Sequence, residues 1–237
     1  MSRAELKSLA KKQIKGNVLI LFVIGLIAGA DHFLGSFFSS IVQSNTLMSN
    51  FNAGFNSGFN AVTVGSKSAT LSPAMFMPLI WCLIISIIIS LVIMSPLRIS
   101  HNYAYLEAAK DQKPGFSMLG YGYKNCWVDS ILLNLLTLVF TFLWSLLFFI
   151  PGIIKTYSYS MSPYIMAENP NIDALEAITK SKEMMKGHKF ELFILDLSFI
   201  LWYLLIPITL GFASIYIAPY VNATRTNFYL KLKEAKA

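Results

Sequence analysis

The chain has 237 residues, of which 55% are hydrophobic and 13% are charged, and its mean hydropathy is +0.58. Because about a quarter of the residues in a soluble domain are charged, this composition excludes an ordinary soluble protein and predicts an integral membrane protein. The formal net charge is +7, and the basic residues that produce it lie beside apolar segments. We therefore expect no nucleic-acid partner and instead expect contact with anionic lipids of the inner leaflet.

The distribution of basic residues predicts the topology. Of the 19 Lys and Arg residues, all but Lys67 and Lys155 fall in four clusters. The clusters span residues 3–15, 98–124, 180–189 and 225–236. Short loops rich in Lys and Arg stay on the cytoplasmic side of a membrane. An apolar hairpin between successive clusters therefore predicts an all-α polytopic fold, with six transmembrane helices in three hairpins and cytoplasmic N- and C-termini.

The N-terminal segment, residues 3–15, has the pattern of an amphipathic helix at the membrane surface. The first span is predicted from Val18 to Ser39, since about 20 helical residues cross a bilayer. The sequence Ala28-Gly29-Ala30 also fits a signal-peptide cleavage site, but apolar residues resume at Phe33, which favours an uncleaved span. The apolar face of the first helix is formed by Leu6, Leu9, Ala10 and Ile14.

Residues 43–72 are predicted to form an extracytoplasmic loop, whose core repeats Phe and Asn with a period of four. A flexible linker is favoured over an aromatic binding loop. The second span follows from Ala74 to Leu97. Residues 100–126 then form a cytoplasmic connector rich in Tyr, a residue that settles at membrane boundaries.

The second hairpin is predicted as a span from Val128 to Ile150, ended by Pro151-Gly152, and a shorter, more polar span from Ile153 to Ala167. Deleting this fourth span would place the third Lys cluster outside the cell, so charge asymmetry favours keeping it. A cytoplasmic amphipathic helix over residues 170–187 follows, with Asn169 as its N-cap. The last two spans are Phe190–Ile206 and Leu210–Tyr229, and a turn at Pro207 connects them.

Two segments of the chain resemble each other. Ala10–Asn17 (AKKQIKGN) resembles Ser181–His188 (SKEMMKGH), and each leads directly into a predicted span. These echoes suggest three degenerate copies of one unit within a single membrane domain, residues 1–237. Repeats build many transport folds, and they also build other helical bundles. The second helix of each hairpin carries a related tripeptide: SPL at 95–97, SPY at 162–164 and APY at 218–220.

No segment has the residue spacing of a catalytic, cofactor or metal site. The three His residues have no ligand spacing, and neither a G-x-S-x-G turn nor an H-E-x-x-H helix occurs. Two Cys residues are too few for a disulfide framework. We therefore expect no catalytic residue, no cofactor and no metal, and we expect that the chain is not an enzyme.

Polar residues inside the predicted spans form the candidate functional site. Charged groups there cost several kcal/mol unless they are paired or hydrated. Asp196 and Arg225 lie at similar depth in adjacent antiparallel spans, so we expect them to pair, with Asn222 close by. A structural clamp, a gated polar site in a permeation path and a neutral or hydrated Asp196 all stay open. Lys155, near the outer end of its span, is expected to reach the headgroups.

Small residues predict one close helix contact. Gly25-x-x-x-Gly29 in the first span and Ser86-x-x-x-Ser90 in the second are motifs typical of helix interfaces in membranes. Counted from the inner surface, Gly25 matches Ser90 in depth, and Gly29 matches Ser86. The two spans are therefore expected to touch at these residues.

Several motifs resemble a known family. They are PGIIKTYSYSM at 151–161, ENP at 168–170, ALEAITKSKEMMKGHK at 174–189, LSFILW at 197–202, TLG at 209–211 and APY at 218–220. They are similar to an uncharacterised bacterial (Firmicutes-type) integral-membrane family, domain of unknown function 975. That resemblance implies a multispanning protein and supplies no activity. A more distant likeness, to the membrane domain of glycerophosphoryl diester phosphodiesterases, implies no activity either, because the chain lacks their soluble catalytic domain.

These observations favour a non-enzymatic membrane protein: a scaffold, an accessory subunit or an envelope-associated factor of the stress or immunity type. A small-solute or ion transporter or channel subunit that uses the intramembrane charged residues is the alternative, and a membrane-embedded enzyme is third. Other membrane proteins or a second copy of the chain are further candidate partners. A polar cavity reaching Asp196 would favour transport, whereas a dry core with exposed apolar grooves would favour partner binding.

Overall fold

The computed structural model describes residues 2–28, 81, 88, 90–147 and 149–235, and every regular element in these ranges is a helix. The predicted all-α class is therefore confirmed for this part of the chain. The predicted loop at 43–72, most of the second span, Gly29 and Ser86 lie outside the described residues. The chain divides into a first unit, residues 1–28 and 91–237, and a second unit, residues 29–90.

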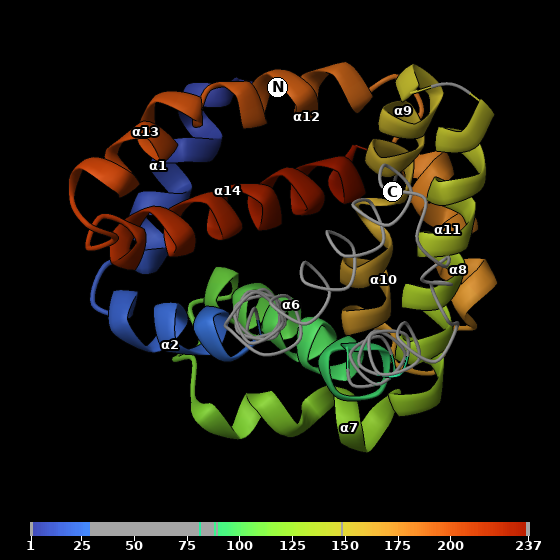
Figure 1. The fold of residues 1–237 in the computed structure, drawn as a ribbon. Helices are drawn as coiled ribbons and strands as arrows, with labels where there is room; N and C mark the ends of the chain where they lie inside the picture. The colour runs from blue at the N-terminus through green and yellow to red at the C-terminus, as the bar shows by residue number, and fades with distance from the viewer. Residues whose placement is uncertain (1, 29–80, 82–87, 89, 148, 236–237) are drawn as a thin grey trace, which may run out of the picture. The chain divides into compact units, whose positions relative to one another are not determined.

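The arrangement described below is that of the first unit, whose helices are labelled in Figure 1. Two short helices of other types accompany the α-helices: the π-helix η2 (Ser90–Met94) and the 3-10 helix η3 (Phe116–Gly120). The α-helices are α1 (Arg3–Ile14), α2 (Val18–Ala28), α6 (Ser95–Ala109), α7 (Tyr121–Asn125), α8 (Trp127–Leu147), α9 (Phe149–Tyr159), α10 (Ser162–Glu168), α11 (Ala174–Met184), α12 (Lys189–Leu197), α13 (Ile200–Ile208) and α14 (Ser214–Glu234).

Helix α14 forms the centre of the first unit. It is drawn in red in Figure 1 and packs against α1, α2, α6 and α13. Apolar and aromatic side chains are buried along its whole length, so its environment is the protein interior. The buried apolar residues of α14 are Ile217, Pro219, Tyr220, Val221, Ala223, Phe228, Tyr229 and Leu232.

Helix α1 lies along α14 and is fixed there by polar contacts as well as apolar ones. The side-chain amides of Gln13 and Asn227 exchange two hydrogen bonds of 2.8 and 3.1 Å, and Lys231 forms an ion pair with Glu5. Leu9, expected on the buried face, is 38% exposed, because the contact with α14 is narrower than the predicted apolar face. The other three predicted residues, Leu6, Ala10 and Ile14, are buried.

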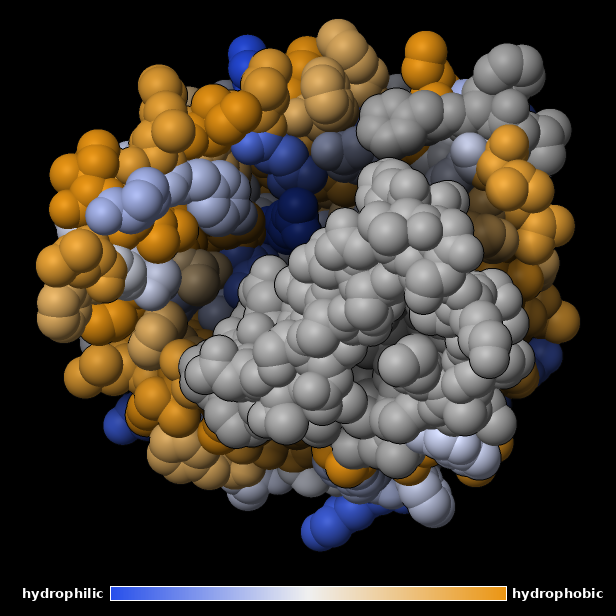
Figure 2. Space-filling model, viewed as in Figure 1, coloured by the Kyte–Doolittle hydropathy of each residue, from blue (hydrophilic) through white to orange (hydrophobic). Residues whose placement is uncertain are grey.

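The outward faces of several helices are apolar. Among the described residues, two helical stretches of 20 residues, Trp127–Leu146 and Lys189–Ile208, are long and apolar enough to cross a membrane. Leu146 and Ile208 at their ends are each 76% exposed. Figure 2 shows hydrophobic side chains over α2 and α13 and hydrophilic ones between the helices. Large contiguous apolar surfaces are rare on soluble monomers, so this surface indicates membrane association.

Two predicted boundaries around the second hairpin are wrong. Pro151 and Gly152 do not end a helix but lie in the first turn of α9, where proline's missing N–H needs no partner. The predicted helix over residues 170–187 begins at Ala174, with Asp173 at the N-cap position. The reason is a turn after α10, closed by a 3.1 Å hydrogen bond from the Ile172 N–H to the Asn169 carbonyl.

The predicted turn at Pro207 is also wrong. Pro207 lies inside α13, and the chain reverses after it, where Leu210 and Gly211 have φ angles of 51° and 93°. Helix α14 starts at Ser214 and continues past the expected end at Tyr229 to Glu234. The predicted fifth span is interrupted between α12 and α13, and the fourth is interrupted between α9 and α10.

The echo between the two basic segments extends to their conformation. Gly16 and Gly187 have φ angles of +88° and +89°, and each separates a surface helix from the next apolar helix. Ile14 and Met185, two residues earlier, are both fully buried and accept equivalent turn hydrogen bonds. Glycine populates positive φ without steric cost, which explains why both copies carry it. These two copies therefore share a helix–glycine–helix structure.

Candidate functional site

The structure brings Asp196 and Arg225 together. Asp196 lies on α12 and Arg225 on the adjacent α14. The guanidinium donates from Nε to Oδ1 at 3.0 Å, and its Nη2 lies 2.9 Å from Oδ2. Such a two-point contact holds both side chains in one geometry. The pair uses two of the five N–H groups of the guanidinium, so Arg225 has further donors for another ligand.

A first cavity opens beside this pair. It has a volume of about 260 Å³, and both Asp196 and Arg225 line it. Its wall includes hydroxyl groups and aromatic rings from α9, α10 and the residue between them. The remaining lining residues are Ile153, Thr156, Tyr157, Ser160, Met161, Tyr164 and Leu192.

A second cavity lies on another side of Arg225. Its volume is about 270 Å³, and it is lined mainly by polar side chains from α6, α8, α9, α10 and α14. Thr156, Ser160 and Arg225 line both cavities, so these three residues form the junction between them. The other polar residues of the second cavity are Ser95, Arg98, Ser130, Asn134, Thr137, Tyr159 and Ser162.

The junction coincides with a break in the helix backbone. Helix α9 ends at Tyr159 and α10 begins at Ser162, so Ser160 lies between two helical segments. Ser181 of α11 bridges the break: its hydroxyl donates to the Ser158 carbonyl at 2.8 Å and accepts from the Met161 N–H at 3.2 Å. Backbone groups freed by the break are thus partly satisfied by a side chain that is itself fully buried.

The other two predicted polar residues lie elsewhere. Asn222 does not join the ion pair; its amide nitrogen lies 3.4 Å from Nε2 of His101 on α6. About one helical turn separates Asn222 from Arg225. The Asn222 side chain contacts α6, whereas the Arg225 side chain contacts α12. Lys155 places its ammonium 4.1 Å from the ring centre of Trp144, so it contacts an aromatic ring of α8.

The predicted small-residue contact stays a prediction. Gly29 and Ser86 lie outside the described residues, and Ser90 belongs to the second unit. Within the first unit, the space beside Gly25 is occupied by α6: a Cβ atom there would lie 3.5 Å from Nε2 of His101. Gly25 therefore faces α6, at a distance that would accommodate a Cβ atom in ordinary van der Waals contact.

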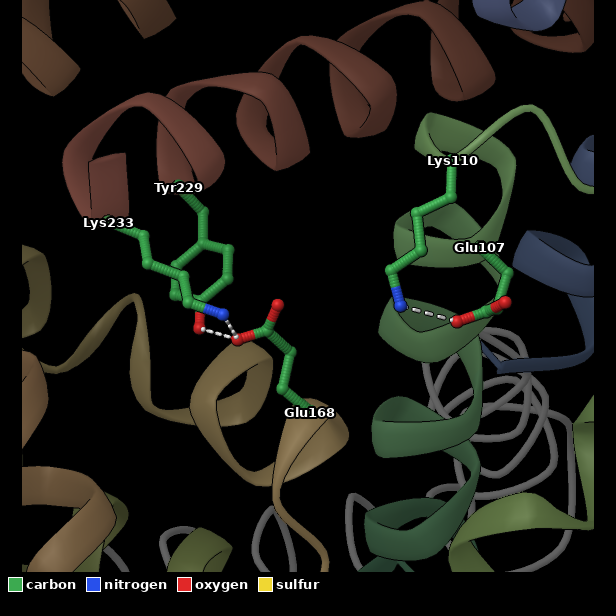
Figure 3. A network of polar contacts seen from close by, with 5 residues as sticks. All are labelled: Glu107, Lys110, Glu168, Tyr229 and Lys233. Atoms are coloured by element: carbon green, nitrogen blue, oxygen red, sulfur yellow. Dashed lines mark hydrogen bonds and ion pairs between the residues drawn. The ribbon is translucent and has the colours of Figure 1, made fainter. Parts of the chain in front are cut away.

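A second polar cluster, which the sequence interpretation missed, joins the ends of α10 and α14. Oε2 of Glu168 at the end of α10 accepts hydrogen bonds from Lys233 Nζ at 2.7 Å and from the Tyr229 hydroxyl at 2.8 Å. Figure 3 shows this group beside the Glu107–Lys110 ion pair of α6, which has a length of 2.8 Å. The ENP motif at 168–170 was the available signal, but it was interpreted as a helix boundary and a family motif, and not as a polar contact.

A metal site is not formed by the part of the chain that the structure describes: no group of three or more His, Cys, Asp or Glu residues there could hold an ion. The chemistry available at the Arg225 junction is instead recognition of charge and hydrogen-bonding groups. It combines guanidinium donors, a carboxylate and several hydroxyl groups around two partly open cavities.

Comparisons with known proteins identify one family. Residues 146–236 match the model of the family described as Protein of unknown function (DUF975). This segment covers α9 to α14 and thus contains Asp196, Arg225 and Glu168. Over these residues the expected resemblance to this family of unknown function is confirmed. Neither the search of the curated proteins nor the search of the solved structures found a match.

Proposed function

We propose that the chain is a single-domain, multi-pass protein of the cell membrane, with six spans in three hairpins and both termini in the cytoplasm. The exposed apolar faces of α8 and α13 support insertion into lipid. The basic clusters support the orientation, because Lys and Arg in short loops remain inside. In this arrangement α1 and α11 lie at the cytoplasmic surface, where their Lys residues contact anionic headgroups.

Within this membrane protein, the proposed function is non-catalytic binding of a small polar solute or ion, of the kind that a transporter or channel subunit performs. The observation that carries the proposal is the helix break at Ser160, which lies where two cavities share Thr156 and Arg225, beside the Asp196–Arg225 pair. Irregular backbone at membrane depth is tolerated where it is buried in protein or lines a cavity. Discontinuous helices also form the solute sites of many transporters.

The cavities favour this function over the scaffold or accessory role. A clamp between two spans needs only the ion pair and does not require the two cavities that meet at Arg225. A binding site for a polar solute uses both. The scaffold role becomes the better account if the junction is closed to water.

Thiol accessibility at the junction tests the proposal. In a background with both natural cysteines replaced by Ser, Ser160→Cys is treated with a charged, membrane-impermeant thiol reagent in inside-out vesicles. The matched control is Leu138→Cys, because Leu138 is 58% exposed on the apolar face of α8 and is expected to face lipid. Ser160→Cys is expected to react and Leu138→Cys to stay unmodified. Equal protection of both thiols would contradict a hydrated binding junction.

A further inference from the structure

We infer that the first cavity, beside the Asp196–Arg225 pair, binds a zwitterionic α-amino acid with an apolar side chain. The ammonium group of this ligand contacts Asp196, its carboxylate contacts Arg225, and its side chain lies against the apolar part of the wall. This inference rests on the proposed function, since it names the ligand class of the same junction.

The charges of the cavity wall sum to zero. Among the described residues that line it, only Asp196 and Arg225 are charged at neutral pH, and their nearest charged atoms are 2.9 Å apart. A lone cation at Asp196 would be repelled by the neighbouring guanidinium, and a lone anion at Arg225 would be repelled by the neighbouring carboxylate. A charge without a partner in a partly buried site is unfavourable. A ligand that carries one charge of each sign avoids both penalties.

Arg225 retains a pair of parallel donors for the ligand carboxylate. Its contact with Asp196 engages Nε at 3.0 Å and Nη2 at 2.9 Å. Within the part of the chain that the structure describes, Nη1 has no hydrogen-bond partner, so Nη1 and the second N–H of Nη2 are available. These two groups point the same way and match the two oxygens of a carboxylate. The Arg225 side chain is 42% exposed, so a ligand can reach this edge.

Acceptor groups for the ligand ammonium lie around Asp196. Each Asp196 oxygen has one contact with the guanidinium, and a carboxylate oxygen can accept more than one hydrogen bond. The Thr156 and Ser160 hydroxyls donate to backbone carbonyls at 3.0 and 2.8 Å, which leaves their oxygens as acceptors. An ammonium group has three donors and no acceptor, so it suits these oxygens. An α-amino acid carries both charged groups on one carbon atom, which matches the adjacent positions of Asp196 and Arg225.

The rest of the wall selects an apolar ligand side chain. Ile153, Met161 and Leu192 line the cavity together with the rings of Tyr157 and Tyr164. An ionised ligand side chain would find no third charged group in the described lining. The volume of about 260 Å³ is roughly nine times the share of one liquid water, about 30 Å³. The cavity therefore has room for an amino acid of the size of leucine.

The test measures binding to the full chain, purified in an uncharged detergent at neutral pH. Calorimetry compares L-leucine, L-methionine and L-phenylalanine, each with two analogues in which hydrogen replaces either the ammonium or the carboxylate. At least one amino acid is expected to bind saturably, and both of its analogues about tenfold more weakly or less, since each loses a charge-assisted contact. Absence of binding for all three amino acids, or equal binding of an analogue, overturns the inference.

Arg225→Lys connects the binding to the ion pair. Lysine keeps a positive charge beside Asp196 but lacks the parallel donors of the guanidinium. The affinity for the amino acid is expected to fall about tenfold or more. The matched control is Arg3→Lys, because Arg3 is exposed on α1 and does not line this cavity. Wild-type affinity in Arg225→Lys, or an equal loss in the control, would overturn the inference.

Ile153→Ala tests the position of the ligand side chain while the ion pair stays intact. Ile153 lines the cavity and is 40% exposed, whereas Ile154 is 46% exposed and does not line it. Ile153→Ala is expected to weaken binding of the amino acid about threefold to tenfold through lost apolar contact. Ile154→Ala should retain wild-type affinity. The same affinity in both variants would place the amino acid outside the first cavity.

The two proposals fail in different ways. If none of the amino acids binds while Ser160→Cys still reacts with the polar reagent, only the ligand class is refuted. If Ser160→Cys is protected and Arg225→Lys does not change amino-acid binding, the solute-binding junction itself is refuted.

Discussion

At the scale of single residues, Arg225 connects the structure to the proposed function, because it takes part in the ion pair and in both cavity walls. The pairing with Asp196 followed from counting depth along two antiparallel spans. The second cavity could not be predicted in this way. Its lining comes from five helices whose relative rotation depends on tertiary packing, so Thr137 and Tyr159 carried no signal in the sequence.

The first residue-scale prediction concerns Asp196→Asn. The substitution leaves the Arg225 charge without its partner, and the pair is partly buried, with 20% of the Asp196 side chain exposed. We expect the free energy of unfolding in detergent to fall by about 1–3 kcal/mol, which is less than for a fully buried pair. Glu176→Gln is the control, because Glu176 and its partner Lys180 are both about half exposed. An equal loss in both variants would contradict the prediction.

A second prediction concerns Glu168→Gln. The Glu168 carboxylate is 12% exposed and accepts bonds from Lys233 and Tyr229, so removing its charge weakens two contacts between α10 and α14. Thermal unfolding should show a loss of about 1–3 kcal/mol. Glu234→Gln, at an exposed position one residue beyond Lys233, serves as the control and should change stability by less than about 0.5 kcal/mol. A neutral Glu168→Gln would mean that the cluster does not hold these helix ends.

A third prediction concerns pH. His101 lies beyond the end of the predicted second span, and its burial lowers the pKa of the imidazole from 6.5 to about 4. Below pH 6.5 the unfolded chain therefore binds a proton that the folded chain does not bind until about pH 4. Stability present above pH 6.5 is lost as the pH falls toward 4, by at most about 1.4 kcal/mol per pH unit.

The predicted loss of stability at lower pH is checked by measuring unfolding at several pH values. Wild type should lose more stability than His101→Gln between pH 6.5 and 4.5, because the glutamine side chain does not titrate. Parallel curves for the two proteins would show that His101 is not the group responsible.

At the scale of helices, the close approach of α7 to α6 depends on a missing side chain. A Cβ atom at Gly122 would overlap the carbonyl oxygen of Pro96, and the Gly122 N–H donates to Ser100 at 2.8 Å. Gly122→Ala is therefore expected to lower the free energy of unfolding by about 1–3 kcal/mol through overpacking. Gly120→Ala is a matched control, since nothing lies within 4 Å of its Cβ position. Similar stability of the two variants would contradict the packing.

The existence of most described helices could be predicted from the sequence, but their ends could not. Hydropathy identified the apolar stretches, and the repeated glycines marked the turns at Gly16 and Gly187. The break at Ser160 was missed because hydrogen bonds from Ser181, 20 residues beyond Met161, stabilise it. Pro151 and Pro207 were misleading for a different reason: proline is tolerated in a first turn, and a helix end can be set by the glycine that follows.

At the scale of the whole molecule, the proposed insertion into a membrane accounts for the distribution of residues. Apolar side chains face outward on α8 and α13, whereas nine Ser, Thr and Asn side chains are buried in the described part. In lipid the outward apolar groups are solvated, and the polar groups must find partners inside the protein. The interior thus combines an apolar core with buried polar groups, while the outer faces of α8 and α13 are apolar as well.

The central claim, six spans with the basic connectors inside the cell, is tested most directly by labelling intact cells with a membrane-impermeant thiol reagent. Asn56→Cys, in the predicted extracytoplasmic loop, and Lys182→Cys, on α11, are compared in the background without natural cysteines. The account predicts that Asn56→Cys is modified from outside and that Lys182→Cys reacts only after the membrane is permeabilised. Modification of Lys182→Cys in intact cells, with Asn56→Cys protected, would contradict it.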